Sequence, residues 1–151
     1  MQTAIDLQDF GAQGITVHPR PDERHIRYKD VFDLRPIVHT EFNIEGNPVE
    51  KFIELVLKAK PEQVTLVPDA EDAITSNAGW DTIKHLAFLT EVIKEFKQNG
   101  IRTSIFLDPD PKFIETAIKT GADRIELYTE AYAKDFASGN KNGVKPYAQT
   151  A

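Results

Sequence analysis

The stretch that decides the fold runs from Gly14 to His25 and reads GITVHPRPDERH. It opens with three β-branched residues, which are typical of a strand, and then meets two prolines. Because proline has no amide proton to give to a sheet, the strand is expected to end there. The side chains just past this point are His18, Arg20, Arg24 and His25. Ligands of parallel α/β folds bind at such carboxyl ends. The segment therefore suits an anion such as a phosphate ester, with a solvated basic loop as the alternative.

Composition excludes several classes of partner. The 151 residues are 40% hydrophobic and 28% charged, with a net charge of −6 and no cysteine. A negative chain is a poor partner for nucleic acid or an anionic membrane surface. Without cysteine there is no disulfide, thiolate catalyst or cysteine-bound metal. Apolar runs are too short to span a membrane and no signal peptide is visible, so we expect a cytoplasmic protein.

Strand patterns recur along the chain, each followed by a helical pattern. They are expected at 15–17, 41–45, 63–67, 101–107 and 124–128. A weak internal repeat supports them, since Gly11-Ala12-x-x-Ile15-x-Val17 resembles Gly121-Ala122-x-x-Ile125-x-Leu127. Crossovers between such strands are right-handed, and the βα order therefore predicts a parallel sheet.

Helices are expected at 4–10, 28–38 and 81–98. Two more are expected after the turns at Asn47-Pro48 and Asp110-Pro111. Asn47 is the expected N-cap of the helix that follows strand 41–45, with Pro48 at its first position. The helix at 81–98 should bury Ile83, Leu86, Ala87, Ile93 and Phe96. The acidic run 108–111 is expected to cap a helix rather than to catalyse, and 138–143 to form a loop.

The alternation of residues within the strands predicts the architecture. One face carries the apolar residues Ile15, Val17, Phe42, Ile44, Val64, Leu66, Ile105, Leu107, Ile125 and Leu127. The other face carries Thr16, His18, Asn43, Glu45, Thr65, Ser104, Asp108, Glu126 and Tyr128. A doubly wound sheet would be apolar on both faces, so this pattern favours an α/β barrel with a polar interior. About five strands are three fewer than a (β/α)₈ TIM barrel needs. Residues 1–151 are therefore expected to form a single, incomplete barrel segment.

Glu45 and His18 are the leading candidates for acid–base chemistry. Glu45 ends its strand on the polar face, where neighbouring apolar residues would raise the pKa of its carboxyl group and suit it as a general base. An ion pair with Arg20 or Arg24 is the alternative. His18 could be an acid–base group, a metal ligand or a structural histidine. Asn43, on the same face, could orient a ligand by a hydrogen bond.

Other residues are weaker candidates. Thr75 lies in a polar loop that could donate to a ligand, although turn chemistry also explains that loop. Glu126 would be costly inside a barrel unless hydrated or paired. His18, His25 and Glu45 could hold a metal, but the nearby arginines would repel a cation. No glycine-rich nucleotide loop or nucleophile elbow is present, so no ATP, NAD or serine-hydrolase chemistry is expected.

With these residues placed, the chain resembles the pyridoxine 5′-phosphate synthase family. The resemblance rests on five blocks in order along the chain: 14–26, Glu41-Phe-Asn43-Ile-Glu45, Leu66-Val67-Pro68 with Ile74-Thr75, Ser104-Ile-Phe-Leu-Asp108, and Arg124-Ile-Glu126-Leu-Tyr128-Thr129. It implies a (β/α)₈ enzyme of vitamin B6 biosynthesis. That enzyme condenses 1-deoxy-D-xylulose 5-phosphate with 3-amino-2-oxopropyl phosphate, forming pyridoxine 5′-phosphate, inorganic phosphate and water.

The resemblance also implies roles for single residues. His18 and Glu45 would be proton acceptors. Arg20, His25 and Thr75 would contact the deoxyxylulose phosphate, and Glu126 would lie in the same cavity. Neither a metal nor a cofactor is implied, and members form homo-oligomers. The family's first strand and its last two strands have no counterpart here, so we expect a fragment that is inactive alone.

Two other functions stay open from the sequence. One is a metal-dependent barrel lyase or isomerase that acts on a phosphorylated substrate through His18, His25 and Glu45. The other is a non-catalytic barrel fragment that binds phosphate weakly at Arg20.

Overall fold

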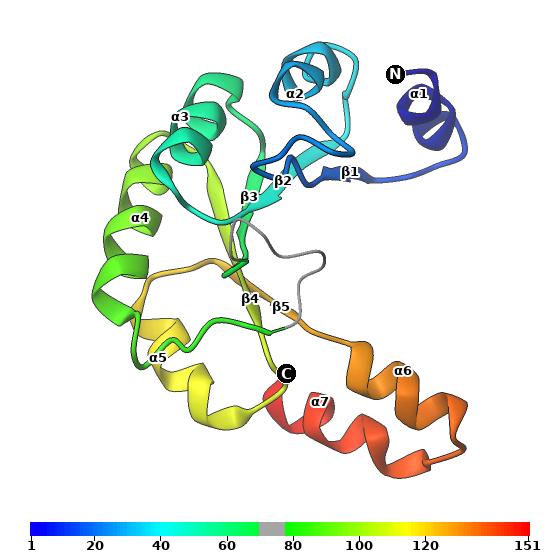
Figure 1. Cartoon of the computed structure of the whole chain (residues 1–151), viewed down its shortest axis with the longest axis vertical. Helices are drawn as coiled ribbons and strands as arrows, with labels where there is room; N and C mark the ends of the chain where they lie inside the picture. The colour runs from blue at the N-terminus through cyan, green and yellow to red at the C-terminus, as the bar shows by residue number, and fades with distance from the viewer. Residues whose placement is uncertain (70–77) are drawn as a thin grey trace.

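A computed structural model of the chain describes residues 1–69 and 78–151 and holds in them one parallel sheet (Figure 1). Its strands lie side by side in chain order: β1 (Gly14–Val17), β2 (Glu41–Gly46), β3 (Gln63–Leu66), β4 (Arg102–Leu107) and β5 (Arg124–Leu127). Every neighbouring pair is parallel. The five expected strands and their direction are confirmed, and the sheet is open, as in a partial (β/α)₈ barrel.

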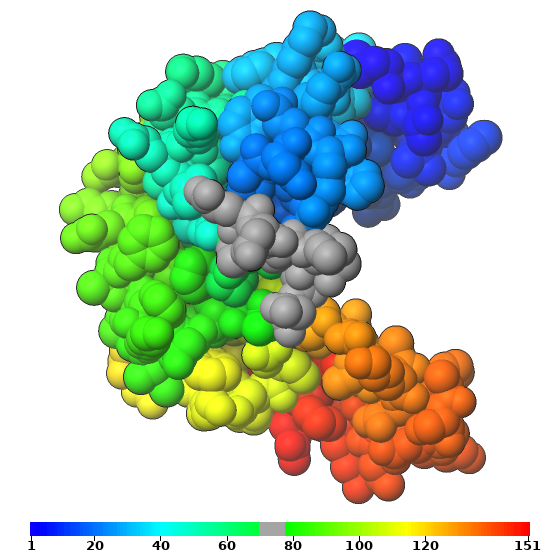
Figure 2. Space-filling view, in the orientation of Figure 1, coloured from blue at the N-terminus to red at the C-terminus, as the bar shows by residue number. Residues whose placement is uncertain are grey.

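Helices precede, connect and follow the strands, and those that connect strands cover one side of the sheet. They are α1 (Gln2–Asp9), α2 (Tyr28–Leu34), α3 (Glu50–Ala59), α4 (Leu86–Gln98), α5 (Ile114–Lys119), α6 (Glu130–Ala137) and α7 (Lys145–Thr150), with short 3₁₀ turns η1 (Pro111–Phe113) and η2 (Lys141–Val144). In Figure 1, α2 to α5 follow one another around the outside of the sheet. Figure 2 shows the resulting crescent, hollowed between the blue N-terminal part and the orange and red α6–α7 part. None of the helices in residues 1–69 and 78–151 has the length and apolar character needed to cross a bilayer.

The core lies between the sheet and this layer of helices. The outward-facing residues of the first four strands are all buried: Ile15, Val17, Phe42, Ile44, Val64, Leu66, Ile105 and Leu107. They pack against helix residues such as Phe52 and Phe96. Each such side chain contributes roughly 1.5–3 kcal/mol on burial. Ile125 of β5 differs, since it is 37% exposed at the edge of the sheet.

The inner face of the sheet is mostly polar, as the alternation predicts, although Phe106 of β4 also lies on it beside Glu126. Asn43 and Thr65 exchange hydrogen bonds across β2 and β3, with the Asn43 Nδ2 donating to Thr65 Oγ1 at 3.1 Å. At the amino-terminal end of the sheet, Arg102 Nε and Arg124 Nη1 both donate to Gln63 Oε1 at 3.0 Å. These bonds satisfy polar groups that would be costly to bury unpaired.

Several helices differ from their expected limits. The helix expected at 81–98 begins at Leu86, because the Asp81 carboxylate accepts from the amides of Ile83 (3.1 Å) and Lys84 (3.0 Å) and forms a separate turn. Burial was wrongly expected at Ile83 and Ala87, which are exposed, and Leu86 is only partly buried. Ile93 and Phe96 are buried as expected, together with Leu89 and Val92. The helix expected at 28–38 ends at Leu34, shortly before Pro36, and the loop expected at 138–143 contains the start of η2. Asp110 caps η1 by accepting from the Lys112 amide at 3.1 Å, which confirms the capping role.

Candidate active site

His18 and Glu45 meet at the carboxyl end of β1 and β2. The pairing of Val17 with Ile44 in neighbouring strands brings the next residue of each strand side by side. His18 Nδ1 lies 3.7 Å from Glu45 Oε2, and the two side chains are 20% and 21% exposed. The sequence-based prediction that these groups share one face at the mouth of the sheet agrees with this geometry. Their separation is an ion-pair distance, slightly too long for a hydrogen bond.

The surroundings of Glu45 favour its protonated form. The pKa of its carboxyl group is raised to about 7, chiefly by burial and also by the charges of Glu126 and Asp69, while the charge of Arg20 opposes them. Near neutral pH the carboxyl group is therefore close to half ionised. A group in that state can both accept and return a proton, which is the requirement for general acid–base catalysis.

His18 is shifted in the opposite direction. Burial and the charge of Arg20 lower the pKa of its imidazole, and Arg24 adds to this, whereas Asp69 raises it. The imidazole is consequently neutral at pH 7 and carries a free lone pair on one nitrogen. This state suits a proton acceptor.

Asp69 is a site residue that the sequence analysis missed. Its Oδ2 accepts from Arg20 Nη1 at 3.0 Å and lies 3.8 Å from His18 Nε2, with the Asp69 side chain only 7% exposed. The sequence does contain a signal for an inward Asp69, because position 69 has the same parity as Gln63 and Thr65, which belong to the inner face. Because Pro68 ends the strand pattern, the sequence alone places Asp69 beyond the expected strand at 63–67.

Asn47 does not cap the helix that follows β2, as the sequence analysis expected. Helix α3 begins at Glu50 with Val49 as its N-cap. The Asn47 Nδ2 instead donates to the Asp69 carbonyl oxygen at 2.6 Å. The asparagine therefore links the segment after β2 to the segment after β3, and its side chain is no longer available for the helix.

The remaining candidates fall in three different positions. His25 is exposed between β1 and α2, and no described hydrogen bond or ion pair joins it to His18 or Glu45. Thr75 lies outside the described residues. Glu126 lies on β5 and is exposed as a whole residue. Its charge nevertheless raises the pKa of Glu45, and partial burial of its carboxyl group raises its own pKa. The structure thus brings together His18, Glu45 and Arg20, with Glu126 across the open interior, whereas no described hydrogen bond or ion pair joins His25 to them.

The metal-site alternative finds no support in this arrangement. Among residues 1–69 and 78–151, no three histidine or acidic side chains are placed to hold a metal ion. His18, His25 and Glu45 therefore do not form a ligand set. Arg20 beside His18 would also repel a cation.

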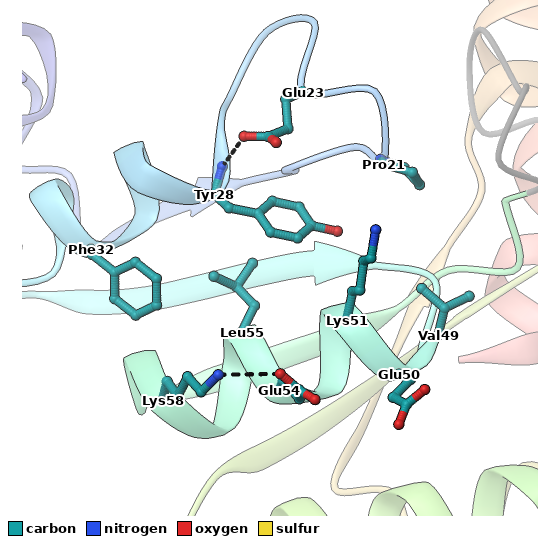
Figure 3. A pocket seen from close by; sticks show the side chains of 10 residues that line it. All are labelled: Pro21, Glu23, Tyr28, Phe32, Val49, Glu50, Lys51, Glu54, Leu55 and Lys58. Carbon is teal, nitrogen blue, oxygen red and sulfur yellow. Dashed lines mark hydrogen bonds and ion pairs between the residues drawn. The ribbon is translucent and has the colours of Figure 1, made fainter.

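A small cavity lies near the site, and a larger groove lies elsewhere on the described surface. One narrow cavity is lined by His18, Arg20, Gly46, Asn47 and Asp69, among others. A groove of about 640 Å³ lies on the outer surface between α2 and α3 (Figure 3). Figure 3 shows Tyr28, Phe32 and Leu55 at its floor and the Glu54–Lys58 pair along its side. None of the acid–base candidates lines it, so we do not assign the chemistry to this groove.

Comparisons with known proteins were made on the whole chain. A family model described as "Pyridoxal phosphate biosynthesis protein PdxJ" matches residues 1–151. The chain is 66% identical to the pyridoxine 5′-phosphate synthases of Christiangramia forsetii and Flavobacterium johnsoniae and 61% identical to that of Cytophaga hutchinsonii. All 151 residues align, and they span 64%, 64% and 63% of those relatives.

Among solved structures, a flavocytochrome b2 variant matches at a TM-score of 0.67 and 13% identity, covering 99% of this chain and 43% of that one. A mandelate oxidase variant matches at 0.66 and 12%, covering 99% and 50%. At such identities the likeness concerns the fold alone.

Proposed function

Because the chain belongs to the PdxJ family of pyridoxal phosphate biosynthesis proteins, we propose that it supplies part of the active site of a pyridoxine 5′-phosphate synthase. In this proposal residues 1–151 form one barrel segment. The enzyme is a transferase that condenses 1-deoxy-D-xylulose 5-phosphate with 3-amino-2-oxopropyl phosphate and releases inorganic phosphate. One observation carries the proposal: His18 lies 3.7 Å from Glu45, whose pKa is raised to about 7.

Each residue has a role in the proposed reaction. A condensation that closes a ring requires protons to be removed from and returned to carbon, nitrogen and oxygen atoms in succession. His18, neutral at pH 7, and Glu45, half ionised there, are the proton acceptors. Arg20 binds the phosphate of deoxyxylulose phosphate by a charge-assisted hydrogen bond. His25 and Thr75 contact the same substrate, and Glu126 faces it from β5.

We expect the 151-residue chain by itself to bind substrate weakly and to form no product. The described sheet has five strands and is open, so it surrounds a ligand on one side only. Water then reaches the acid–base groups and weakens the electrostatic interactions on which catalysis depends. A steady-state assay that detects pyridoxine 5′-phosphate would contradict this expectation.

We further propose that the protein is cytoplasmic and forms homo-oligomers. The substrates are small, highly charged metabolites, which suits a cytoplasmic enzyme. The outer edges of β1 and β5 have no partner strand in the described sheet, and such edges pair readily with other chains.

A phosphate titration tests the proposed function. Inorganic phosphate and 1-deoxy-D-xylulose 5-phosphate are titrated separately into the chain while amide and arginine side-chain NMR signals are followed. Arg20→Ala is expected to weaken binding about tenfold, because it removes one charge-assisted hydrogen bond. Arg35→Ala is the matched control, since Arg35 pairs with Glu62 at the surface, with a 34% exposed side chain. If neither ligand shifts the signals of residues near His18, or if both variants weaken binding equally, the proposal fails.

A further inference from the structure

We propose that Asp69 is a positioning residue: one of its carboxylate oxygens holds the guanidinium of Arg20 by a hydrogen bond and, 3.8 Å from the imidazole of His18, offsets the charge of that arginine at the ring. The meaning of this arrangement for catalysis rests on the function proposed above. The arrangement itself consists of contacts and charges, and it can be tested without an activity assay.

The contacts form a continuous row of alternating groups. The Glu45 carboxylate lies 3.7 Å from His18 Nδ1, and His18 Nε2 lies 3.8 Å from Asp69 Oδ2. The same Oδ2 accepts from Arg20 Nη1 at 3.0 Å. The imidazole thus lies between two carboxylates, and the second of these is bound to the arginine.

The backbone of Asp69 is fixed from the neighbouring strand. The Val67 amide donates to the Gly46 carbonyl at 3.0 Å, which extends the pairing of β2 with β3. The Asn47 side chain then holds the Asp69 carbonyl at 2.6 Å. Because the Asp69 side chain is also 7% exposed, its carboxylate has little freedom to move away from His18 and Arg20. A short, held carboxylate orients a long arginine side chain more firmly than a mobile one would.

Asp69 also offsets the charge that Arg20 places beside the imidazole. Among residues 1–69 and 78–151, the charged groups that act on His18 are Arg20 and Arg24 from the segment after β1, Glu45 from β2 and Asp69 from the segment after β3. Arg20 and Arg24 lower the pKa of His18, and Asp69 raises it. Without Asp69, the positive charge of Arg20, which suits phosphate binding, would lower the pKa of His18 further. His18 would then be a weaker base.

The test is a pH titration of the four histidine signals of the full chain by NMR, with His18 assigned by His18→Gln. Asp69→Asn keeps the size of the side chain but removes its charge, and it is expected to lower the pKa of His18. Arg20→Gln is expected to raise that pKa, and the double variant to return it toward the parent value. Asp9→Asn on α1, an exposed residue, makes the same change of charge elsewhere and is the control.

Two outcomes would overturn the inference. One is a folded Asp69→Asn chain whose His18 titrates as in the parent and in Asp9→Asn. The other needs no variant: if the Arg20 guanidinium of the parent rotates freely at pH 7 in side-chain NMR, it is not held by Asp69. The second measurement decides the question if Asp69→Asn does not fold. Loss of phosphate binding with these couplings intact would instead refute the proposed function and leave the role of Asp69 standing.

Discussion

The carboxyl group of Glu45 is held in a position that favours chemistry over stability. Its pKa rises from 4.5 to about 7 on folding, chiefly through burial. Between these two values the folded chain binds more protons than the unfolded chain. The free energy of unfolding therefore falls as the pH rises from about 4.5 to about 7, and the loss is complete above that range. At 1.36 kcal/mol per pKa unit, this loss amounts to as much as about 3 kcal/mol.

Glu45→Gln removes this pH-dependent loss in the free energy of unfolding, because glutamine has a similar shape and no charge. We expect the variant to be more stable than the parent at pH 8, by up to about 3 kcal/mol, and equally stable near pH 4. Urea unfolding at the two pH values measures both differences. The exposed Glu91 on α4 provides a control, and Glu91→Gln should leave stability unchanged at both. If the Glu45→Gln chain is no more stable than the parent at pH 8, ionisation of the buried carboxyl group does not destabilise the fold.

At the scale of elements, helix α1 depends on one buried glutamine. Gln8 Nε2 donates to the Ile37 carbonyl at 3.2 Å, while Gln8 Oε1 accepts from the amides of His39 (2.9 Å) and Thr40 (3.2 Å). These bonds join α1 to the connection between α2 and β2. Leu7 and Phe10, by contrast, are exposed, so hydrophobic burial alone holds this helix weakly.

Gln8→Leu keeps much of the volume of the side chain but leaves the amides of His39 and Thr40 without their acceptor. We expect a loss of about 1–3 kcal/mol in the free energy of unfolding and faster hydrogen exchange throughout α1. Native-state hydrogen exchange followed by NMR measures both effects. Gln98→Leu, at the exposed end of α4, is the control. Unchanged exchange in α1 would mean that other contacts hold the helix.

At the scale of the whole molecule, the sheet is covered unevenly. Its outer face is buried under helices from β1 to β4, whereas Ile118 of α5 and Ile125 of β5 are 72% and 37% exposed. An edge strand with exposed apolar side chains and unpaired backbone groups favours association with another chain.

We therefore expect the chain to self-associate through the β5 edge. The sedimentation coefficient should rise with protein concentration, and Ile125→Lys should shift the transition to higher concentration by placing a charge on that edge. Val144→Lys, at a 50% exposed residue of η2, tests whether any added lysine has this effect. A chain that sediments as a monomer throughout, or equal effects of the two lysines, would contradict association at β5.

Much of the architecture was predictable because it depends on local patterns. Alternation within the strands placed Ile44 outward and Glu45 inward, and a one-residue error would have reversed both. Helix limits were less secure, because side chains such as Asp81 and Asn47 have more than one possible partner. Asp81 forms a separate turn before α4, and Asn47 bonds across to Asp69 rather than to its own helix.

The sequence by itself determined the order and direction of the strands, the side of the sheet to which their alternating residues belong, and the closeness of His18 and Glu45 at its carboxyl end. These follow from periodicity and from the pairing of consecutive βα units, which depend on neighbours in the chain. Only the tertiary structure decided that the carboxylate of Asp69 lies between Arg20 and His18. Arg20 and Asp69 are 49 positions apart in the chain. Their contact depends on how three strands pack together, and no local pattern contains that information.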